Sequence, residues 1–268
     1  MLRDITIGQY YKADSIIHKL DPRLKLAATV LFIITLFFSN TPTAYIIATI
    51  YLAVIIKLSA VPFRYMIKGL KAVIVLIVFT AIFNLFFTPG LDVLVEFGSI
   101  RITIAGLKKT IYVVIRLIYL ILGSSLMTYT TTPNQLTDGI EKAFKPLNKL
   151  SIPVHEFALM MSLALRFIPI LMDETDKIMK AQSARGADFE HGNIITKAKN
   201  VIAIIIPLLV SATKRASDLA LAMDARCYHG GNGRTKMKPL KYGKRDYAGY
   251  AVALVYFGLM IVLKIYHI

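Results

Sequence analysis

The chain has 268 residues, of which 56% are hydrophobic, and its formal net charge is +16. Soluble domains are about 45 to 50% apolar, so this composition favours a membrane protein. The basic excess then indicates an anionic membrane surface rather than nucleic acid, whose binding requires no long uncharged runs. The single cysteine, Cys227, excludes an intramolecular disulfide and argues against a cysteine-based zinc site.

The N-terminal part of the chain is polar up to residue 25 and then becomes almost wholly apolar. Asp21 followed by Pro22 predicts the start of a helix, with Asp21 as its N-cap. Apolar runs at residues 24–38 and 44–58, separated by a short uncharged turn, predict a hairpin of two transmembrane helices. Each run is slightly shorter than the roughly 20 residues that cross the hydrocarbon core.

The next connection is strongly basic and contains no acidic residue, so the positive-inside rule places it in the cytoplasm. Its basic residues are Lys57, Arg64, Lys68 and Lys71. Residues 72–87 and 111–129 predict the third and fourth transmembrane helices. Between them, residues 88–109 are predicted as an external loop, with a small extended element where polar and apolar residues alternate at 99–104.

The character of the sequence changes between residues 130 and 245, where charges of both signs appear among apolar residues at helical spacing. This pattern is typical of amphipathic helices. Two apolar runs, at residues 157–171 and 201–210, are interpreted as too short to span and therefore as buried or re-entrant helix. The region is predicted to be a helical domain at the cytoplasmic face of the membrane.

A basic cluster precedes the last apolar run, at residues 247–263, and is expected to hold that end in the cytosol. The cluster consists of Lys236, Lys238, Lys241, Lys244 and Arg245. The predicted fold is therefore an all-α membrane protein with about five transmembrane helices and a cytoplasmic coupling domain of long amphipathic helices. Its parts are residues 1–129 with four spans, the coupling domain at 130–245, and the last span at 246–268, with the N-terminus in the cytoplasm.

The sequence contains no motif of a known catalytic site. It has no phosphate-binding loop, no zinc-protease motif and no serine-hydrolase motif. His18, His155, His191 and His229 are scattered, and they are interpreted as surface or helix-end residues rather than a metal site. We therefore expect a chain that is not an enzyme and that binds neither a metal nor a cofactor itself.

Two short pieces of the predicted cytoplasmic domain have similar sequences, and we call them the arginine motifs. They are Ala184-Arg185-Gly186 and Ala225-Arg226-Cys227. Ala181 and Ala222 precede them at helical spacing, so the surface beside each arginine is flat, and a guanidinium pairs well with carboxylates of a partner. One such piece is equally an ordinary helix end with a basic residue that favours the dipole. The repetition favours docking of partners.

The motifs and their order resemble the transmembrane T component of energy-coupling factor (ECF) transporters, which take up vitamins or metal ions in prokaryotes. The resemblance covers nearly the whole chain. It includes Ser-Ile-Ile-His-Lys-Leu-Asp-Pro-Arg at 15–23, Leu-Arg-Phe-Ile-Pro-Ile-Leu at 165–171 leading to Glu174, the two arginine motifs with their preceding alanines, and Arg234-Thr235.

The resemblance implies a scaffold in the cell membrane for an ATP-driven importer of vitamins. In this family the arginine motifs end coupling helices that dock on two ATP-binding-cassette subunits, which bind ATP and Mg²⁺, while a small membrane subunit binds the substrate. The usual second motif is Ala-Arg-Gly, and we expect docking to tolerate Cys227 because cysteine is also small. The apolar faces at residues 157–171 and 201–210 are expected either to hold the substrate-binding subunit or to pack within the domain.

Two other functions are alternatives to this one, and a third has no support in the sequence. One is a T component of the cobalt or nickel type, although by resemblance the 15–23 segment fits the vitamin type better. A self-sufficient secondary transporter would need intramembrane ionisable groups or broken helices, and usually an inverted repeat, none of which the first four predicted spans clearly show. A membrane enzyme acting on lipid would need a convergent polar site that the sequence does not offer.

Overall fold

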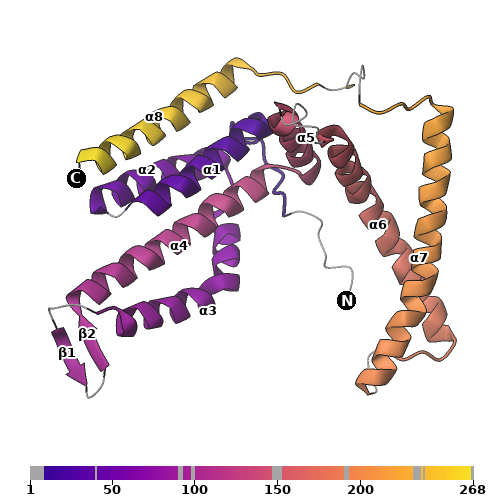
Figure 1. Ribbon diagram of the computed structural model, residues 1–268, viewed down its shortest axis with the longest axis horizontal. Coiled ribbons are helices and arrows are strands. Elements are labelled where there is room, and N and C mark those ends of the chain that lie inside the picture. The colour runs from indigo at the N-terminus through magenta and orange to yellow at the C-terminus, as the bar shows by residue number, and fades with distance from the viewer. Residues whose placement is uncertain are drawn as a thin grey trace. The chain divides into compact units, whose positions relative to one another are not determined.

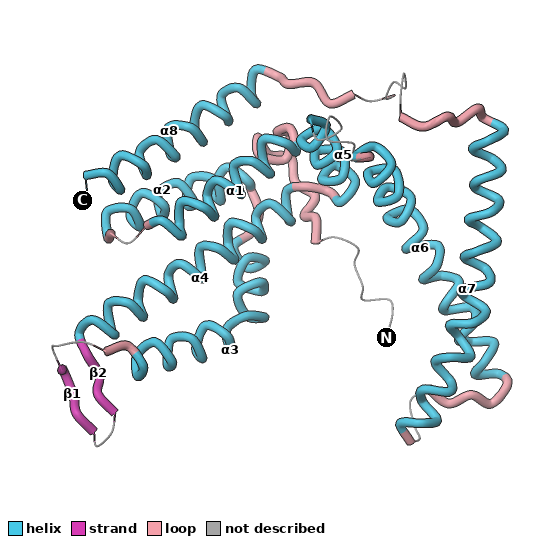
Figure 2. Tube along the Cα trace, viewed as in Figure 1, coloured by secondary structure: helices cyan, strands magenta, loops and turns pink. Residues whose placement is uncertain are grey.

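The computed structural model describes residues 9–39, 41–89, 93–97, 100–146, 153–189, 193–231, 237 and 239–266. These residues form helices and one two-stranded hairpin (Figures 1 and 2). The chain divides into two compact units. We call residues 8–139 with 240–268 the bundle unit, and residues 140–239 the crossed-helix unit.

The predicted all-α membrane fold is confirmed. The helices are α1 (Pro22–Phe38), α2 (Pro42–Ser59), α3 (Phe63–Phe87), α4 (Ile104–Thr130), α5 (Pro133–Phe144), α6 (Val154–Ala184), α7 (Ile194–Ala225) and α8 (Lys244–Tyr266). By length and composition, α2, α3, α4, α6, α7 and α8 could each cross a membrane. Helix α1 has 17 residues, one fewer than α2, the shortest of these six helices.

The interpretation of two apolar runs as too short to span is wrong. Residues 157–171 and 201–210 lie within α6 and α7, which have 31 and 32 residues and are long and apolar enough to cross. Pro169 and Pro207, which lie within the two apolar runs, do not end the helices. Polar and charged residues beyond each run extend its helix to a length that can cross.

The extended element predicted at residues 99–104 is confirmed. Strand β1 (Val93–Phe97) pairs antiparallel with β2 (Ile100–Thr103), with Phe97 opposite Ile100 (Figure 2). Thr103 then begins α4 as its N-cap, because its hydroxyl accepts a hydrogen bond of 3.0 Å from the amide of Gly106. Helices α3 and α4 both begin earlier than predicted, since their first turns include the basic residues that were assigned to loops.

The core of the bundle unit lies between α1, α2, α4 and α8. Helix α1 packs against both α4 and α8, and α3 packs along α4. The buried side chains include Phe32, Leu36, Tyr45, Leu52, Met66, Leu122, Leu126, Tyr256 and Met260. Gly123 permits the close approach of α4 to α1, because a Cβ at this position would lie 2.8 Å from the ring of Phe32.

The starts of α1, α3 and α8 and the ends of α2 and α4 lie at one end of the bundle unit. Three hydrogen bonds join these ends: Lys25 Nζ to the Thr130 carbonyl (2.8 Å), the Asp21 amide to Asp246 Oδ1 (2.7 Å), and Tyr129 Oη to the Tyr65 carbonyl (3.0 Å). We call residues 9–25, 57–68, 130–139 and 240–246 the basic end, because they carry ten basic and four acidic residues.

The segment before α1 is fixed to α8 by two buried aspartates. Asp21 is the N-cap of α1, as predicted: its Oδ1 accepts from the amide of Arg23 at 2.9 Å, and both its oxygens accept from the Arg23 guanidinium. Asp246 accepts from the amides of Asp21 (2.7 Å) and Gly243 (2.8 Å). The guanidinium of Arg23 also lies 3.8 Å from the ring centroid of Tyr242. Much of the 15–23 segment therefore serves to join α1 to α8.

The interpretation of His18 as a surface or helix-end residue is wrong. Only 9% of its surface is exposed. Its Nδ1 lies 2.7 Å from the hydroxyl of Ser15, and its Nε2 lies 2.9 Å from the carbonyl oxygen of Tyr11. His18 therefore holds the folded segment before α1 in place, and a chain turn rather than a helix supplies its partners.

Candidate docking site

The crossed-helix unit consists mainly of α6 and α7, which run antiparallel. The side-chain amide of Gln182 donates to the Ala203 carbonyl (3.3 Å), and Arg215 pairs with Glu174 (2.9 Å) further along. Residue numbers rise along one helix as they fall along the other, as an antiparallel pair requires. Figure 1 shows the two helices crossing.

The first arginine motif closes α6 with a Schellman arrangement. The amide of Gly186 donates to the Ser183 carbonyl and the amide of Ala187 donates to the Gln182 carbonyl, both at 3.0 Å. Gly186 has a φ of +89°, in the left-handed region that this ending requires. The last carbonyls of the helix are thereby satisfied, and Arg185 lies at the turn as the C-cap.

The second arginine motif repeats this geometry at the end of α7. The amide of Cys227 donates to the Asp224 carbonyl (2.9 Å), and the amide of Tyr228 donates to the Met223 carbonyl (3.1 Å). Cys227 has a φ of +56°, so it occupies the position that Gly186 occupies in the first motif. The repeat seen in the sequence is therefore also a repeat of backbone geometry.

All six residues of the two motifs are exposed to solvent. Within the described part of the chain, neither the Arg185 nor the Arg226 side chain takes part in a hydrogen bond or an ion pair. Both guanidinium groups are therefore available to a partner. A planar fork of N–H donors suits a carboxylate, which it can contact through two parallel hydrogen bonds.

The two motifs lie at opposite ends of the antiparallel pair. Arg185 precedes a loop that returns to the start of α7, where Asn200 donates to the Asp188 carbonyl at 2.6 Å, and Arg226 follows the end of α7. Since α7 has 32 residues, a rise of 1.5 Å per residue separates its ends by about 48 Å. One small partner domain cannot reach both motifs, so the geometry suits two partners or a dimer.

The positive φ values at the motifs predict opposite effects of two substitutions. We expect Gly186→Ala to destabilise its helix end by about 1 kcal/mol and Cys227→Gly to stabilise its helix end by a similar amount, because a Cβ is strained in the left-handed region. Hydrogen exchange of the amides at 182–187 and 223–228, followed by mass spectrometry, measures both. Gly258→Ala is the control, since Gly258 lies inside α8 with open space around it. If Gly186→Ala changed the hydrogen exchange of the 182–187 amides no more than Gly258→Ala does, the prediction would be contradicted.

The ion pair between Arg215 and Glu174 across the crossing was not predicted. Glu174 lies in a segment that carries the resemblance to T components, but its partner Arg215 lies 41 residues later, and only helical spacing on both helices could have suggested the pair. His155, interpreted as a surface or helix-end residue, is partly buried, and its Nδ1 lies 2.9 Å from Glu141. Gly231 packs on its ring, where a Cβ would approach to 2.5 Å. His191 and Arg234-Thr235 lie outside the described residues.

The histidines that the structure describes do not gather into a metal site. Among the described residues, no group of three or more His, Cys, Asp or Glu side chains could hold a metal ion. His229 is exposed near the end of α7.

Known proteins resemble the chain over nearly its full length. The family described as "Cobalt transport protein" (CbiQ) matches residues 13–237. A protein of Clostridium kluyveri is 49% identical over 267 residues, which are 99% of each chain. A protein of Bacillus subtilis is 42% identical over 264 residues, 98% of this chain and all of its relative. Both are called "Energy-coupling factor transporter transmembrane protein EcfT".

The chain belongs to this family. Identity near one half over the whole length also covers both arginine motifs, so the similarity is not confined to the bundle unit. The expected resemblance to the T component of ECF transporters is thereby confirmed, and the chain is a multi-pass membrane component of a transporter with further components.

Proposed function

We propose that this chain is the non-catalytic coupling scaffold of an ATP-driven, ECF-type vitamin importer. The observation that carries the proposal is the pair of exposed arginine motifs with the same helix-ending geometry, one at each end of an antiparallel helix pair. Arg185 and Arg226 bind carboxylates on two ATP-binding-cassette subunits, and these subunits bind the ATP and Mg²⁺. Closure of these two subunits then moves both ends of the crossed helices together.

The bundle unit is oriented with its basic end in the cytoplasm. The positive-inside rule supports this orientation, because the basic end has ten basic residues, whereas fewer basic residues lie towards the opposite end of the unit. Those at the opposite end are Arg101, Lys108, Lys109, Arg116 and Lys264. The N-terminal segment and the start of α8 are then cytoplasmic.

The coupling domain, residues 130–245, lies at the cytoplasmic face with α6 and α7 not fully crossing the membrane. The antiparallel pairing of the helices supports this placement. If both helices spanned the bilayer, Arg185 and Arg226 would lie on opposite sides, and cytosolic subunits could bind only one of them. Charges in the second half of α6 and at both ends of α7 support the same placement, because ionisable side chains are costly in the hydrocarbon core.

A small substrate-binding membrane subunit covers the apolar faces of α6 and α7. In support, the side chains of Phe157, Met161, Ile206 and Leu209 are each more than half exposed, so packing among the described residues of the crossed-helix unit does not account for them. Contiguous exposed apolar surface marks an interaction site or a lipid contact. The cargo would be a vitamin, as the 15–23 segment favours. The alternative is cobalt, which the family description names, or nickel.

Purification of the complex tests this function. We expect the tagged chain, extracted from its native membranes in mild detergent, to carry along two ATP-binding-cassette subunits and a small membrane protein, identified by mass spectrometry. Transport of the labelled vitamin or metal by the reconstituted complex then decides the cargo. A chain that purifies alone and transports in liposomes without ATPases would be a secondary transporter, and the proposal would be wrong.

A further inference from the structure

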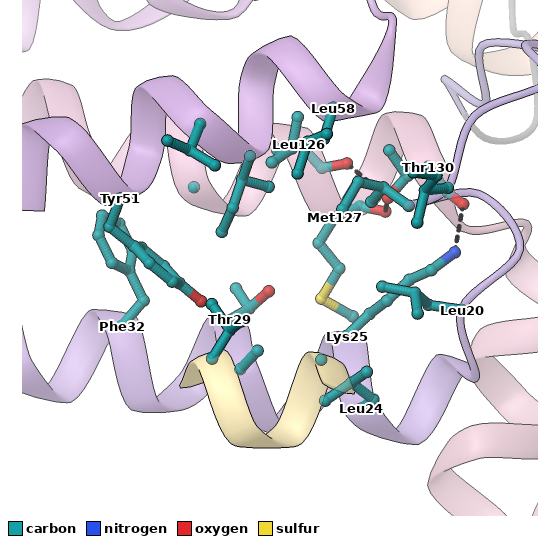
Figure 3. A pocket seen from close by; sticks show the side chains of 18 of the residues that line it. Leu20, Leu24, Lys25, Thr29, Phe32, Tyr51, Leu58, Leu126, Met127 and Thr130 are labelled. Carbon is teal, nitrogen blue, oxygen red and sulfur yellow. Dashed lines mark hydrogen bonds between the residues drawn. The ribbon is translucent and has the colours of Figure 1, made fainter. Parts of the chain in front are cut away.

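The bundle unit contains an elongated cavity between α1, α2, α4 and α8, with a volume of about 330 Å³ (Figure 3). Its walls are almost entirely apolar, and they include Leu24, Phe32, Tyr51 and Leu126. A volume of this size lies at the lower end of the range for small-molecule pockets. The cavity is thus large enough to hold part of one flexible apolar chain.

The cavity has one apolar and one polar end. Figure 3 shows Phe32 and Tyr51 at one end and Lys25 with Thr130 at the other. Lys25 and Phe32 are seven residues apart on α1, so the helical rise separates the two ends by about 10 Å. Arg245, in the first turn of α8, also lines the cavity. The polar end therefore coincides with the basic end of the bundle.

Lys25 is a buried cation with unused hydrogen-bonding capacity. Only 6% of its surface is exposed, and its Nζ donates to the carbonyls of His18 (3.1 Å) and Thr130 (2.8 Å). An ammonium group has three donors, and no acceptor for the third is found among the described residues. The acidic groups that attract it, Asp21 and Asp246, accept hydrogen bonds from other groups.

Arg245 adds a second cation that no acidic side chain neutralises. It is exposed, and within the described ranges it forms no ion pair or side-chain hydrogen bond. Lys244, its neighbour, is also exposed but does not line the cavity. The polar end of the cavity thus presents positive charge without a matching anion.

A lipid is the occupant that matches an apolar cavity with a basic end. Because lipid tails are as apolar as the cavity walls, the hydrophobic effect alone selects no lipid from the bilayer. The selection must therefore come from the head group, whose phosphate is attracted by both cations, Lys25 and Arg245. Val54, Leu58 and Val252 line the cavity and are each about half exposed, so a tail can enter sideways from the membrane.

We propose that this cavity binds one anionic phospholipid, with an acyl chain between α1, α2, α4 and α8 and its phosphate at Lys25 and Arg245. The bound lipid neutralises Lys25 and fills the gap beside α8, so it joins α8 to the rest of the bundle. This site is separate from the arginine motifs. It also does not depend on which partners dock there.

Native mass spectrometry of the full chain in detergent tests the proposal, with phosphatidylglycerol and phosphatidylcholine of identical acyl chains as probes. We expect phosphatidylglycerol to bind at least about tenfold more tightly, because two cations near the head group each favour an anion several-fold. Equal binding of the two lipids would overturn the proposal. The occupant of the cavity would then be an apolar segment of a partner helix instead of an anionic lipid.

Three variants locate the binding. Arg245→Gln should lower phosphatidylglycerol affinity by about tenfold, whereas the matched change Lys244→Gln, outside the cavity, should lower it by no more than about fivefold through general surface charge. Ala248→Phe, a change at an exposed lining position, should block the cavity and remove the preference for phosphatidylglycerol. Equal losses for Arg245→Gln and Lys244→Gln, or unchanged binding by Ala248→Phe, would show that the lipid lies elsewhere.

Discussion

ATP-driven uptake is expected to fall nearly to background when Arg185 and Arg226 are both replaced by alanine. Each arginine is exposed and unpaired within the described residues, so each is available for a carboxylate of an ATPase subunit. Truncation of one partner in a desolvated charged pair costs about 2 to 5 kcal/mol of binding free energy. Under the proposed function, the double variant loses both contacts with the ATPase subunits, whereas either single variant should keep part of the uptake.

The measurement is uptake of labelled substrate by proteoliposomes that contain the reconstituted complex, together with the amount of ATPase that co-purifies. Lys180→Ala combined with Lys214→Ala is the matched control, because both lysines are exposed on the same two helices but outside the motifs. Arg185→Lys should have an intermediate effect, since lysine keeps the charge but loses the planar fork. Unimpaired uptake by the double arginine variant would refute docking through these residues.

Local sequence patterns were sufficient to predict most of the bundle. Apolar runs located its helices, alternation located the β1–β2 hairpin, and Asp21 before Pro22 located the start of α1. These features depend on residues that are close together in the sequence. The same reasoning failed for α6 and α7, because a helix continues through charged residues and an internal proline when partners along its length stabilise it.

The candidate site was predictable in its residues but not in its geometry. The repeated Ala-Arg pieces marked both helix ends correctly, since α6 ends at Ala184 and α7 at Ala225. The antiparallel crossing that places them far apart involves contacts between residues distant in the sequence, such as Arg215 and Glu174, which lie on different helices. The left-handed conformation of Cys227 was also not evident, because a non-glycine residue gives no local signal for it.

The contact between Asp21 and Asp246 shows the same limit, since 225 residues separate them. We expect Asp246→Ala to lower the free energy of unfolding by about 3 kcal/mol. The buried carboxylate accepts hydrogen bonds from two amides, and hydrogen bonds to charged groups contribute about 1.5 to 3 kcal/mol each, with a further cost for donors left unsatisfied. Thermal unfolding of the purified chain in detergent measures the change.

Asp14→Ala is the appropriate control for Asp246→Ala, because it removes the same charge from the same end of the bundle. The side chain of Asp14 is 93% exposed and, among the described residues, pairs only with Lys19, at 3.2 Å, and exposed pairs contribute about 0 to 1 kcal/mol. If the two variants unfold at the same temperature, the buried carboxylate does not join α8 to α1. The carboxylate of Asp246, in the first turn of α8, reaches the amide of Asp21 in the segment before α1. A much lower Tm for Asp246→Ala alone would therefore identify the contact between Asp21 and Asp246 as the one that holds α8 in the bundle.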